Sequence, residues 1–531
     1  MSRRNTKPSN TTAARRGRTR ILTGGGTFPP RVGGLETEIS LRVPPLPNES
    51  RVEQIQRNLQ LVREFVASCP DNADIAWSYR YPVELYRFDA VNRVLANGSR
   101  LYSDHSYVEY STAECSDPLD LVAVDQSGER LLAQLLGQFR QSLPGGKAVL
   151  VKNNVVYPRA AEHYAVSHAC HENYTTSPGL FHDICHGGAS TVAYAWLSYL
   201  ASRIIITGAG RLSPALPDEF APFFSSARLP ELMRDPGTGS ADRRRLKQIR
   251  RNLNRVQFDL ALDTQFEISA RAAFMTRLRS HETTEFRPLI NLRDEPHADP
   301  YRYRRLHVIS GDSNRSETST YLKFGCALLV LALLETAHLP APPVLLDPLN
   351  ALRRYSRDVT LTYAAPAFGD TAIRAIELQE YFWEQVQLSI ERGNMPAPPW
   401  SQPVMDLWRT VLDDLRVDPL RLGDRLDWII KLRLLSQISV EQRVDDLAWR
   451  RRFDLAYHSI GPGDGYLRLL KHGQVKSITT DERVSRLTFS APADTRAAQR
   501  MSIIAGNSVD EANWNYIQLA DGTEYWLDDP A

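Results

Sequence analysis

The feature that most restricts what this chain can fold into is an apolar segment from residue 322 to residue 334. Apolar side chains occur on every side of the helix that it predicts, so this helix must be buried on all faces. Its uninterrupted apolar run, Gly325 to Leu334, is about half the length needed to cross a bilayer. The spacing Asn314-Arg-Ser-Glu317 predicts the start of the helix. The chain therefore needs a core thick enough to surround a helix.

Composition excludes several classes of protein. The chain has 531 residues, 42% hydrophobic and 24% charged, which is too apolar for a protein disordered throughout. Five cysteines exclude a disulfide scaffold and fit the reducing cytoplasm, where we expect the protein. Length alone predicts roughly three domains.

The net charge of +2 hides a difference between residues 1–33 and the rest. This arm carries eight of the 64 basic residues and none of the 62 acidic ones, so the remainder is mildly acidic. It is rich in Ser, Thr, Asn and Gly without an apolar period, which predicts disorder, and it lacks the apolar region of a secretory signal. A solvated tail is the simplest interpretation. The alternatives are an organelle transit peptide, or a tail that contacts nucleic acid or an acidic partner.

Order is predicted from residue 34 onward. Alternation over Leu35–Val43 predicts a half-buried strand, and the capping-box spacing Ser50-Arg-Val-Glu53 opens a helix. Prolines, a Gly-rich break and a basic cluster predict a surface insertion at 212–256. We expect a large domain at 34–450 and a small C-terminal domain at 451–531. Further predictions are strands at 100–108 and 148–156, a helix at 119–139, and mainly helices at 371–435.

Two polar segments fall on predicted strands. Glu36 and Glu38 are two residues apart, so both carboxylates point to one face of their strand, about 7 Å apart. They suit a cation if they face inward, and they are an ordinary polar strand face if they face outward. The second segment holds Arg100, Tyr102, Asp104, Glu109 and Glu114. This set suits a polyphosphate with Mg²⁺, and a polar edge strand is the alternative.

Two further segments are dense in charged and metal-ligating types. His and Cys residues gather between 163 and 186, but they lack the paired spacing of a zinc site, so a structural zinc is disfavoured. Residues 287–317 are rich in Arg, Asp, Glu, His and Asn and lead into the buried helix. A charged stretch between core elements suits carboxylate or phosphate binding, because the Arg fork matches two oxygens.

Four motifs follow one another along the chain: Gly34-Leu-Glu-Thr-Glu38, Asn97-Gly-Ser-Arg-Leu-Tyr-Ser-Asp104, His171-Glu-Asn-Tyr174 and Arg293-Asp-Glu-Pro-His-Ala-Asp299. In this order they resemble the Pup ligase and Pup deamidase/depupylase family of the carboxylate-amine ligase superfamily. The resemblance covers most of residues 31–531. It implies an α+β, glutamine-synthetase-like fold, in which a curved, mainly antiparallel sheet forms the active-site cradle. Helices pack on the other face of this sheet, and a small C-terminal α/β domain follows.

The resemblance also implies ATP and Mg²⁺ as cofactors and roles for single residues. Asp104 resembles the catalytic aspartate. Metal contacts are implied for Glu36, Glu38, Tyr102 and Glu109. Nucleotide contacts are implied for Arg100, Thr112 and Trp514. Substrate contacts are implied for Arg293, His171 and Asn173.

Two activities share one active site in this family. The deamidase/depupylase acts on the C-terminal Gln of Pup and on its isopeptide bond to lysine, whereas the ligase joins the C-terminal Glu to lysine through an acyl phosphate. The spacing from Asp104 to Glu109 is that of the deamidase branch, since the ligase branch has one residue more. Cys170-His-Glu-Asn-Tyr174 looks more like the ligase. We favour the deamidase/depupylase, with the ligase as the alternative and a non-catalytic modifier-binding homologue as a third.

The resemblance implies Pup or a Pup-like modifier and pupylated proteins as partners, with a functional link to the bacterial proteasome. We expect no membrane and no nucleic acid. The chain departs from the family at Tyr107-Val108, where His-Pro is usual, and at Val155-Val156, near which an Asp is usual. Both departures leave every implied metal residue and the implied catalytic aspartate in place.

Overall fold

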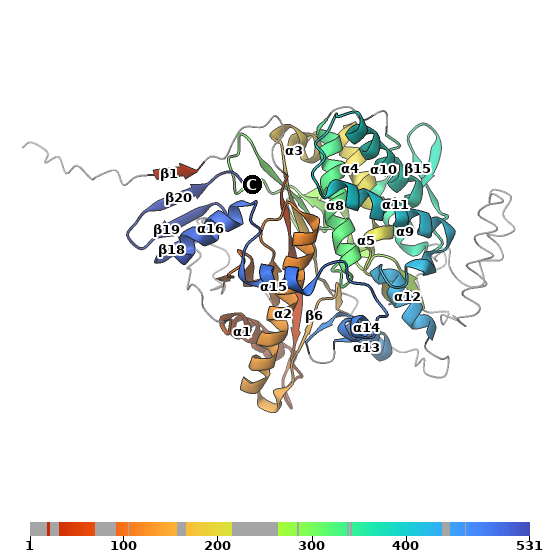
Figure 1. Cartoon of the computed structure of the whole chain (residues 1–531). Coiled ribbons are helices and arrows are strands. Elements are labelled where there is room, and N and C mark those ends of the chain that lie inside the picture. The colour runs from red at the N-terminus through yellow and green to blue at the C-terminus, as the bar shows by residue number, and fades with distance from the viewer. Residues whose placement is uncertain are drawn as a thin grey trace, which may run out of the picture.

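The computed structural model describes residues 18–21, 31–69, 92–104, 106–156, 166–188, 190–214, 264–283, 286–336, 339, 342–437, 447–461 and 464–531. Most of the predicted arm and most of the predicted insertion lie outside these residues. A large sheet runs through the middle of the molecule, and helices cover one of its faces (Figure 1).

In the part of the chain that the structure describes, the central sheet has ten strands. Eight of them follow the order β12-β13-β14-β9-β2-β5-β4-β3, while β6 pairs with both β2 and β17. Only the pair β12–β13 is parallel, so the predicted, mainly antiparallel sheet is confirmed. The strands are β2 (Gly33–Arg42), β3 (Asn92–Val94), β4 (Arg100–Asp104), β5 (Tyr107–Ser111), β6 (Val149–Val151), β9 (Cys170–Thr176), β12 (Arg277–Ser280), β13 (Pro288–Asn291), β14 (Arg304–Val308) and β17 (Ser459–Ile460).

Two predicted strands are each divided in the structure. The one predicted over 100–108 is the hairpin β4–β5, in which Asp104 pairs with Tyr107 across a two-residue connection. The one predicted over 148–156 is β6 followed by β7 (Val155–Val156), which pairs with β8 (Val166–Ser167). The division was hidden in the sequence because residues 105 and 106 are His and Ser, without the Gly or Pro that usually marks a turn.

The apolar segment forms α8 (Glu317–Glu335), at the centre of the helical layer. Its N-cap is Ser316, whose hydroxyl accepts from the Ser319 amide, so the helix begins two residues later than the spacing from Asn314 predicted. By length and composition alone α8 could cross a membrane, but 94% of its apolar window is buried inside the protein. Phe324 stacks on Tyr174 of β9 with ring centroids 5.7 Å apart, which joins the helix to the sheet.

Most of the other helices surround α8 or line the lower part of the sheet, whereas α16 lies beside the strands near the end of the chain (Figure 1). The capping box predicted at Ser50 is present at the start of α1. The helices are α1 (Arg51–Ala67), α2 (Pro118–Ser142), α3 (Pro178–Cys185), α4 (Thr191–Ser202), α5 (Ile204–Thr207), α9 (Pro348–Arg357), α10 (Ala375–Glu391), α11 (Ser401–Val417), α12 (Asp427–Gln437), α13 (Leu447–His458), α14 (Gly465–Lys471), α15 (Asp481–Phe489) and α16 (Arg496–Ala505). Two antiparallel strand pairs stand outside the central sheet: β10 (Arg211–Pro214) with β11 (Thr264–Glu267), and the hairpin of β15 (Ala364–Ala367) with β16 (Thr371–Arg374).

A second, smaller sheet forms near the end of the chain, with the order β1-β20-β19-β18. Its strands are β1 (Arg18–Ile21), β18 (Val509–Ala512), β19 (Tyr516–Leu519) and β20 (Glu524–Leu527). Here β1 pairs in parallel with β20, so four residues of the arm differ from the predicted disorder. The strand β17, although beyond residue 450, belongs to the central sheet; the predicted domain boundary stays a prediction.

The last seven residues of the fourth polar segment, residues 311–317, make contacts within the protein. The Asp312 carboxylate accepts from the backbone amides of Ala209 and Ala270, each at 2.8 Å. Buried Arg315 pairs with Glu129 at 3.1 Å and with Asp464 at 2.6 Å. The charges of Asp312 and Arg315 are thus used within the protein, and the prediction of carboxylate or phosphate binding stays a prediction for residues 287–307.

Candidate active site

The period of β2 divides its side chains between two environments. Leu35, Thr37 and Ile39 are buried against the helices, whereas Glu36 and Glu38 lie on the opposite face. Side chains directly opposite each other on paired antiparallel strands share one face. The residues predicted for the metal are therefore gathered on the face of the sheet that the helices do not cover.

A row of oxygen-bearing side chains crosses three strands on this face. Glu38 of β2 is paired with Glu109 of β5, and Glu109 is paired with Tyr102 of β4. Asp104, at the end of β4, lies two positions beyond Tyr102 on the same face. The predicted catalytic aspartate thus stands beside the predicted metal row.

Glu36 is held by side chains from two neighbouring strands. Asn173 donates to Glu36 Oε1 at 2.9 Å, and His171 Nδ1 lies 3.3 Å from Oε2, so two predicted substrate residues contact a predicted metal residue. Arg305 Nη1 donates to Asn173 Oδ1 at 2.8 Å and lies 3.7 Å from Glu36 Oε1. His307 Nδ1 lies 2.6 Å from the same Asn173 oxygen. Sequence reasoning did not select Arg305 and His307, although their alternation within a charged segment was the available signal.

The carboxylates on this face have opposite electrostatic surroundings. Burial raises the pKa of Glu109 well above its usual value, and the nearby charges of Asp104, Glu36 and Glu38 raise it further. Burial also acts to raise the pKa of Glu36, but the hydrogen bond from His171 and the positive charge of Arg305 outweigh it, so that pKa is lowered. A divalent cation would relieve the repulsion around Glu109, and its oxygen ligands suit Mg²⁺.

A second arrangement on the same face could also hold a metal. In the described part of the chain, ligand atoms of Glu36, His171 and His307 lie within 4.8 Å of one another. Burial lowers the pKa of His307 well below 6.5, so its imidazole is neutral and can act as a ligand. Glu36 therefore belongs to both candidate sets, and the predicted set also includes Glu38, Tyr102 and Glu109. Both candidate sets lie on this face of the sheet.

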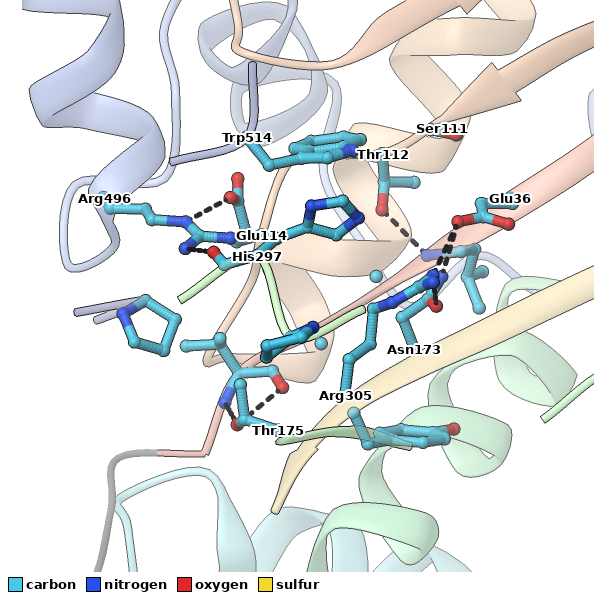
Figure 2. A pocket seen from close by; sticks show the side chains of 17 residues that line it. Glu36, Ser111, Thr112, Glu114, Asn173, Thr175, His297, Arg305, Arg496 and Trp514 are labelled. Carbon is cyan, nitrogen blue, oxygen red and sulfur yellow. Dashed lines mark hydrogen bonds and ion pairs between the residues drawn. The ribbon is translucent and has the colours of Figure 1, made fainter. Parts of the chain in front are cut away.

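A cleft of about 570 Å³, including its open mouth, begins at Glu36 and extends toward the smaller sheet. In Figure 2, Glu36 and Arg305 lie at one end, and Arg496 and His297 lie at the other. Two predicted nucleotide residues, Thr112 and Trp514, line the cleft. The whole lining is Val32, Gly33, Gly34, Leu35, Glu36, Ser111, Thr112, Glu114, Asn173, Tyr174, Thr175, Pro296, His297, Arg305, Arg496, Trp514 and Pro530.

Two further predicted contacts, Arg100 and Arg293, do not line the cleft. The guanidinium of Arg100 lies 4.5 Å from the centre of the Trp514 ring, which orients the indole. Arg293 is exposed, while its charge contributes to lowering the pKa of His307. Burial, followed by the charges of Arg305 and Arg496, lowers the pKa of His297 to about 3, so this imidazole is neutral at pH 7.

Glu114 does not have the role in binding metal or phosphate that its neighbours in sequence suggested. Its carboxylate accepts from Arg496 Nε at 2.7 Å and from Arg500 Nη2 at 2.8 Å. Burial acts to raise the pKa of Glu114, but the two guanidinium groups outweigh it, and the pKa is lowered. Arg500 also donates to the Trp514 carbonyl at 2.8 Å. Glu114 therefore fastens α16 and Trp514 to the central sheet and does not join the metal row.

The family model, the curated relatives and two solved structures point to one family. Residues 31–518 match the family model described as Pup-ligase protein. The chain is 31% identical to a depupylase of Acidothermus cellulolyticus, over 92% of this chain and 90% of the relative. It is 34% identical to a Pup–protein ligase of Kocuria rhizophila, over 81% of this chain and 84% of the relative.

Two solved structures of the Pup ligase PafA also match this chain. The complex between the prokaryotic ubiquitin-like protein Pup and its ligase PafA matches with a TM-score of 0.69 and 26% identity, over 94% of this chain and 89% of the other. PafA in complex with ADP matches with a TM-score of 0.64 and 27% identity, over 92% and 94%. The fold expected from the sequence, with its large, mainly antiparallel sheet, is confirmed.

Proposed function

Because the chain belongs to the Pup-ligase family, whose named members act on Pup, we propose that it is an ATP- and Mg²⁺-dependent deamidase/depupylase. Its substrates would be the C-terminal Gln of Pup or a Pup-like modifier, and the isopeptide bond that joins the modifier to lysine. The observation that carries this proposal is the short hairpin that places Asp104 beside the carboxylate row.

The hairpin supports the deamidase because it leaves room for two residues between β4 and β5. A shift of one residue would turn every side chain of β5 to the other face, Glu109 included. The additional residue typical of the ligase branch therefore has to enter the connection next to Asp104. This chain lacks that residue and instead pairs Asp104 directly with Tyr107.

The geometry supports separate binding roles for the residues in and beside the cleft. Thr112 and Trp514 would bind the nucleoside, and Glu36, Glu38, Tyr102 and Glu109 would hold Mg²⁺. Bound Mg²⁺ would neutralise phosphate charge and orient the phosphates. Arg293, exposed beside this face, would pair with a carboxylate of the modifier, and His171 and Asn173 would hold the reacting end.

In the proposed reaction the Asp104 carboxylate attacks the γ-carbonyl of the terminal residue, or activates a water that does so. The C–N bond breaks, and the leaving ammonia or lysine amine takes up a proton. After direct attack, water cleaves the acyl–Asp104 bond, which leaves a γ-carboxylate on the modifier and restores Asp104.

The experiment uses ATP, Mg²⁺ and two forms of Pup, one ending in Gln and one in Glu. The deamidase proposal expects ammonia from the Gln form. Conjugation of the Glu form to lysine with consumption of ATP, and no ammonia, would refute it. Asp104→Asn should abolish the reaction while ADP affinity is retained; full activity in this variant would contradict the assignment of Asp104.

The ligase is the second candidate. It is favoured by the motif Cys170-His-Glu-Asn-Tyr174 on β9, and relatives named Pup–protein ligase are as similar as those named depupylase. In that reaction Asp104 would deprotonate the attacking lysine. A chain with neither activity that still binds Pup would be the non-catalytic homologue.

For cellular context we propose pupylated proteins as substrates and a functional link to the bacterial proteasome. We also propose a cytoplasmic location. All five cysteines are buried and free of disulfides, which supports a reducing compartment.

A further inference from the structure

A short segment after β20, residues 528–530, forms part of the cleft wall. It lies beyond residue 518, where the match to the family model ends. Pro530 lines the cleft, and Asp528 and Asp529 are each only 5% exposed. Acidic residues this deeply buried need partners, and the partners show what the segment joins.

On one side the segment is bonded to the loop that precedes β14. The Asp528 carbonyl accepts from the Asp299 amide at 2.9 Å. The Asp529 carboxylate accepts from the Tyr303 hydroxyl at 3.0 Å and lies 3.6 Å from Arg302 Nη1. This loop carries His297 into the cleft, so the segment supports one wall of it.

On the other side the segment is bonded to the elements that carry Trp514. The Pro530 carbonyl accepts from the Arg496 amide at 3.3 Å, at the start of α16. The Leu527 amide donates to the Asn515 carbonyl at 2.8 Å, next to Trp514 in the chain. The Arg496 side chain donates to the His297 carbonyl and so ties the two sides together.

The two ends of the cleft suit different parts of a nucleotide. Figure 2 shows Glu36 and Arg305 at one end, and Arg496 and His297 at the other. At the second end the charge of Arg496 is balanced by Glu114, and the remaining surfaces include the flat rings of Trp514 and His297 and the apolar ring of Pro530. Such surfaces suit a planar, uncharged group, whereas the carboxylate end suits phosphates with their cation.

We propose that residues 528–530 form the wall against which the nucleobase packs, with Pro530 in contact and Asp529 as a positioning residue. This inference rests on the proposed function, which makes the cleft a nucleotide site. Asp529 acts through Tyr303 and Arg302, which hold the loop bearing His297. The base would thus be enclosed by two parts of the chain, Trp514 on one side and the loop and segment on the other.

The test compares two ligands in the full-length protein, both with Mg²⁺ and measured by calorimetry. ADP has a base, and tripolyphosphate has none. Deleting residues 528–531 should raise the Kd for ADP about tenfold and leave that for tripolyphosphate within about twofold. Unchanged ADP binding, or an equal loss for both ligands, would overturn the proposal.

Two point variants guard against a deletion that fails to fold. Pro530→Gly removes the ring, and Asp529→Ala removes the support of the loop. Both variants should bind ADP more weakly, with the affinity for tripolyphosphate unchanged. Asp510→Asn, at an exposed position of β18, is the matched control and should leave the affinities for both ligands unchanged. If the unaltered protein binds no ADP, the proposed function fails; if it binds ADP and all three tail variants bind it equally well, only this inference fails.

Discussion

Replacing Glu114 by Ala tests whether one buried carboxylate holds the smaller sheet to the central sheet. The Glu114 side chain is 11% exposed, and its partners Arg496 and Arg500 are 6% and 0% exposed. Removing one partner from such a buried pair costs about 3–5 kcal/mol, because the remaining charges stay buried without compensation. Two guanidinium groups lose their partner here, so we expect a loss of about 4 kcal/mol in the free energy of unfolding.

The loss should appear first around α16. Arg500 donates to the Trp514 carbonyl, and both Arg496 and Arg500 join α16 to the central sheet through Glu114. We therefore expect α16 and the smaller sheet to separate from the central sheet before the core around α8 unfolds. Urea unfolding followed by tryptophan fluorescence and by far-UV circular dichroism should give two transitions in the variant. ADP affinity should fall together with the first transition.

A surface ion pair provides the control. Asp413 pairs with Arg409 on α11, and these side chains are 59% and 30% exposed. Asp413→Asn should therefore cost only about 0.3–0.5 kcal/mol. A loss below about 1 kcal/mol for Glu114→Ala would refute the reasoning, since the pair would then contribute no more than a surface pair.

The ion pairs of Glu114 also predict how the free energy of unfolding changes with pH. The pKa of Glu114 is lower in the folded protein than its ordinary value of 4.5, so the folded state binds its proton less tightly. The stabilisation is fully present above pH 4.5 and is lost as pH falls below that value toward the folded pKa. Glu114→Ala should therefore flatten the acid limb of the stability profile.

Three further predictions concern the cleft. Glu109→Gln should stabilise the metal-free protein by about 1 kcal/mol, because it removes a buried repelled carboxylate, and should weaken Mg²⁺ binding measured by calorimetry; a destabilised metal-free variant would contradict this. Trp514→Ala should raise the Kd for ADP at least about tenfold, and an unchanged Kd would remove Trp514 from the nucleotide site. Arg305→Lys keeps the charge but loses the two-pronged guanidinium that donates to Asn173 and Glu295. We expect kcat to fall about tenfold with the melting temperature nearly unchanged. A kcat equal to that of the wild type would show that the guanidinium geometry is not needed.

Local sequence patterns predicted many of the side chains on the face of the central sheet that the helices do not cover. The period of two in β2 placed Glu36 and Glu38 on one side, and the same period placed Tyr102 and Asp104 together on β4. The apolar segment likewise determined that α8 lies inside a thick helical layer. These features depend only on neighbouring residues in the chain, where side-chain direction follows from backbone geometry.

Contacts between distant segments were beyond such reasoning. Arg305 meets Asn173 because β14 pairs with β9, and Glu114 meets Arg500 across 386 residues of chain. The charged residues 311–317 looked like a ligand site until their partners proved to be buried groups of the protein itself. Local sequence determined which side chains the active face presents. Tertiary structure decided which of them are satisfied internally and which remain for a ligand, because hydrogen-bond partners are chosen by strand order and register, which no short segment contains.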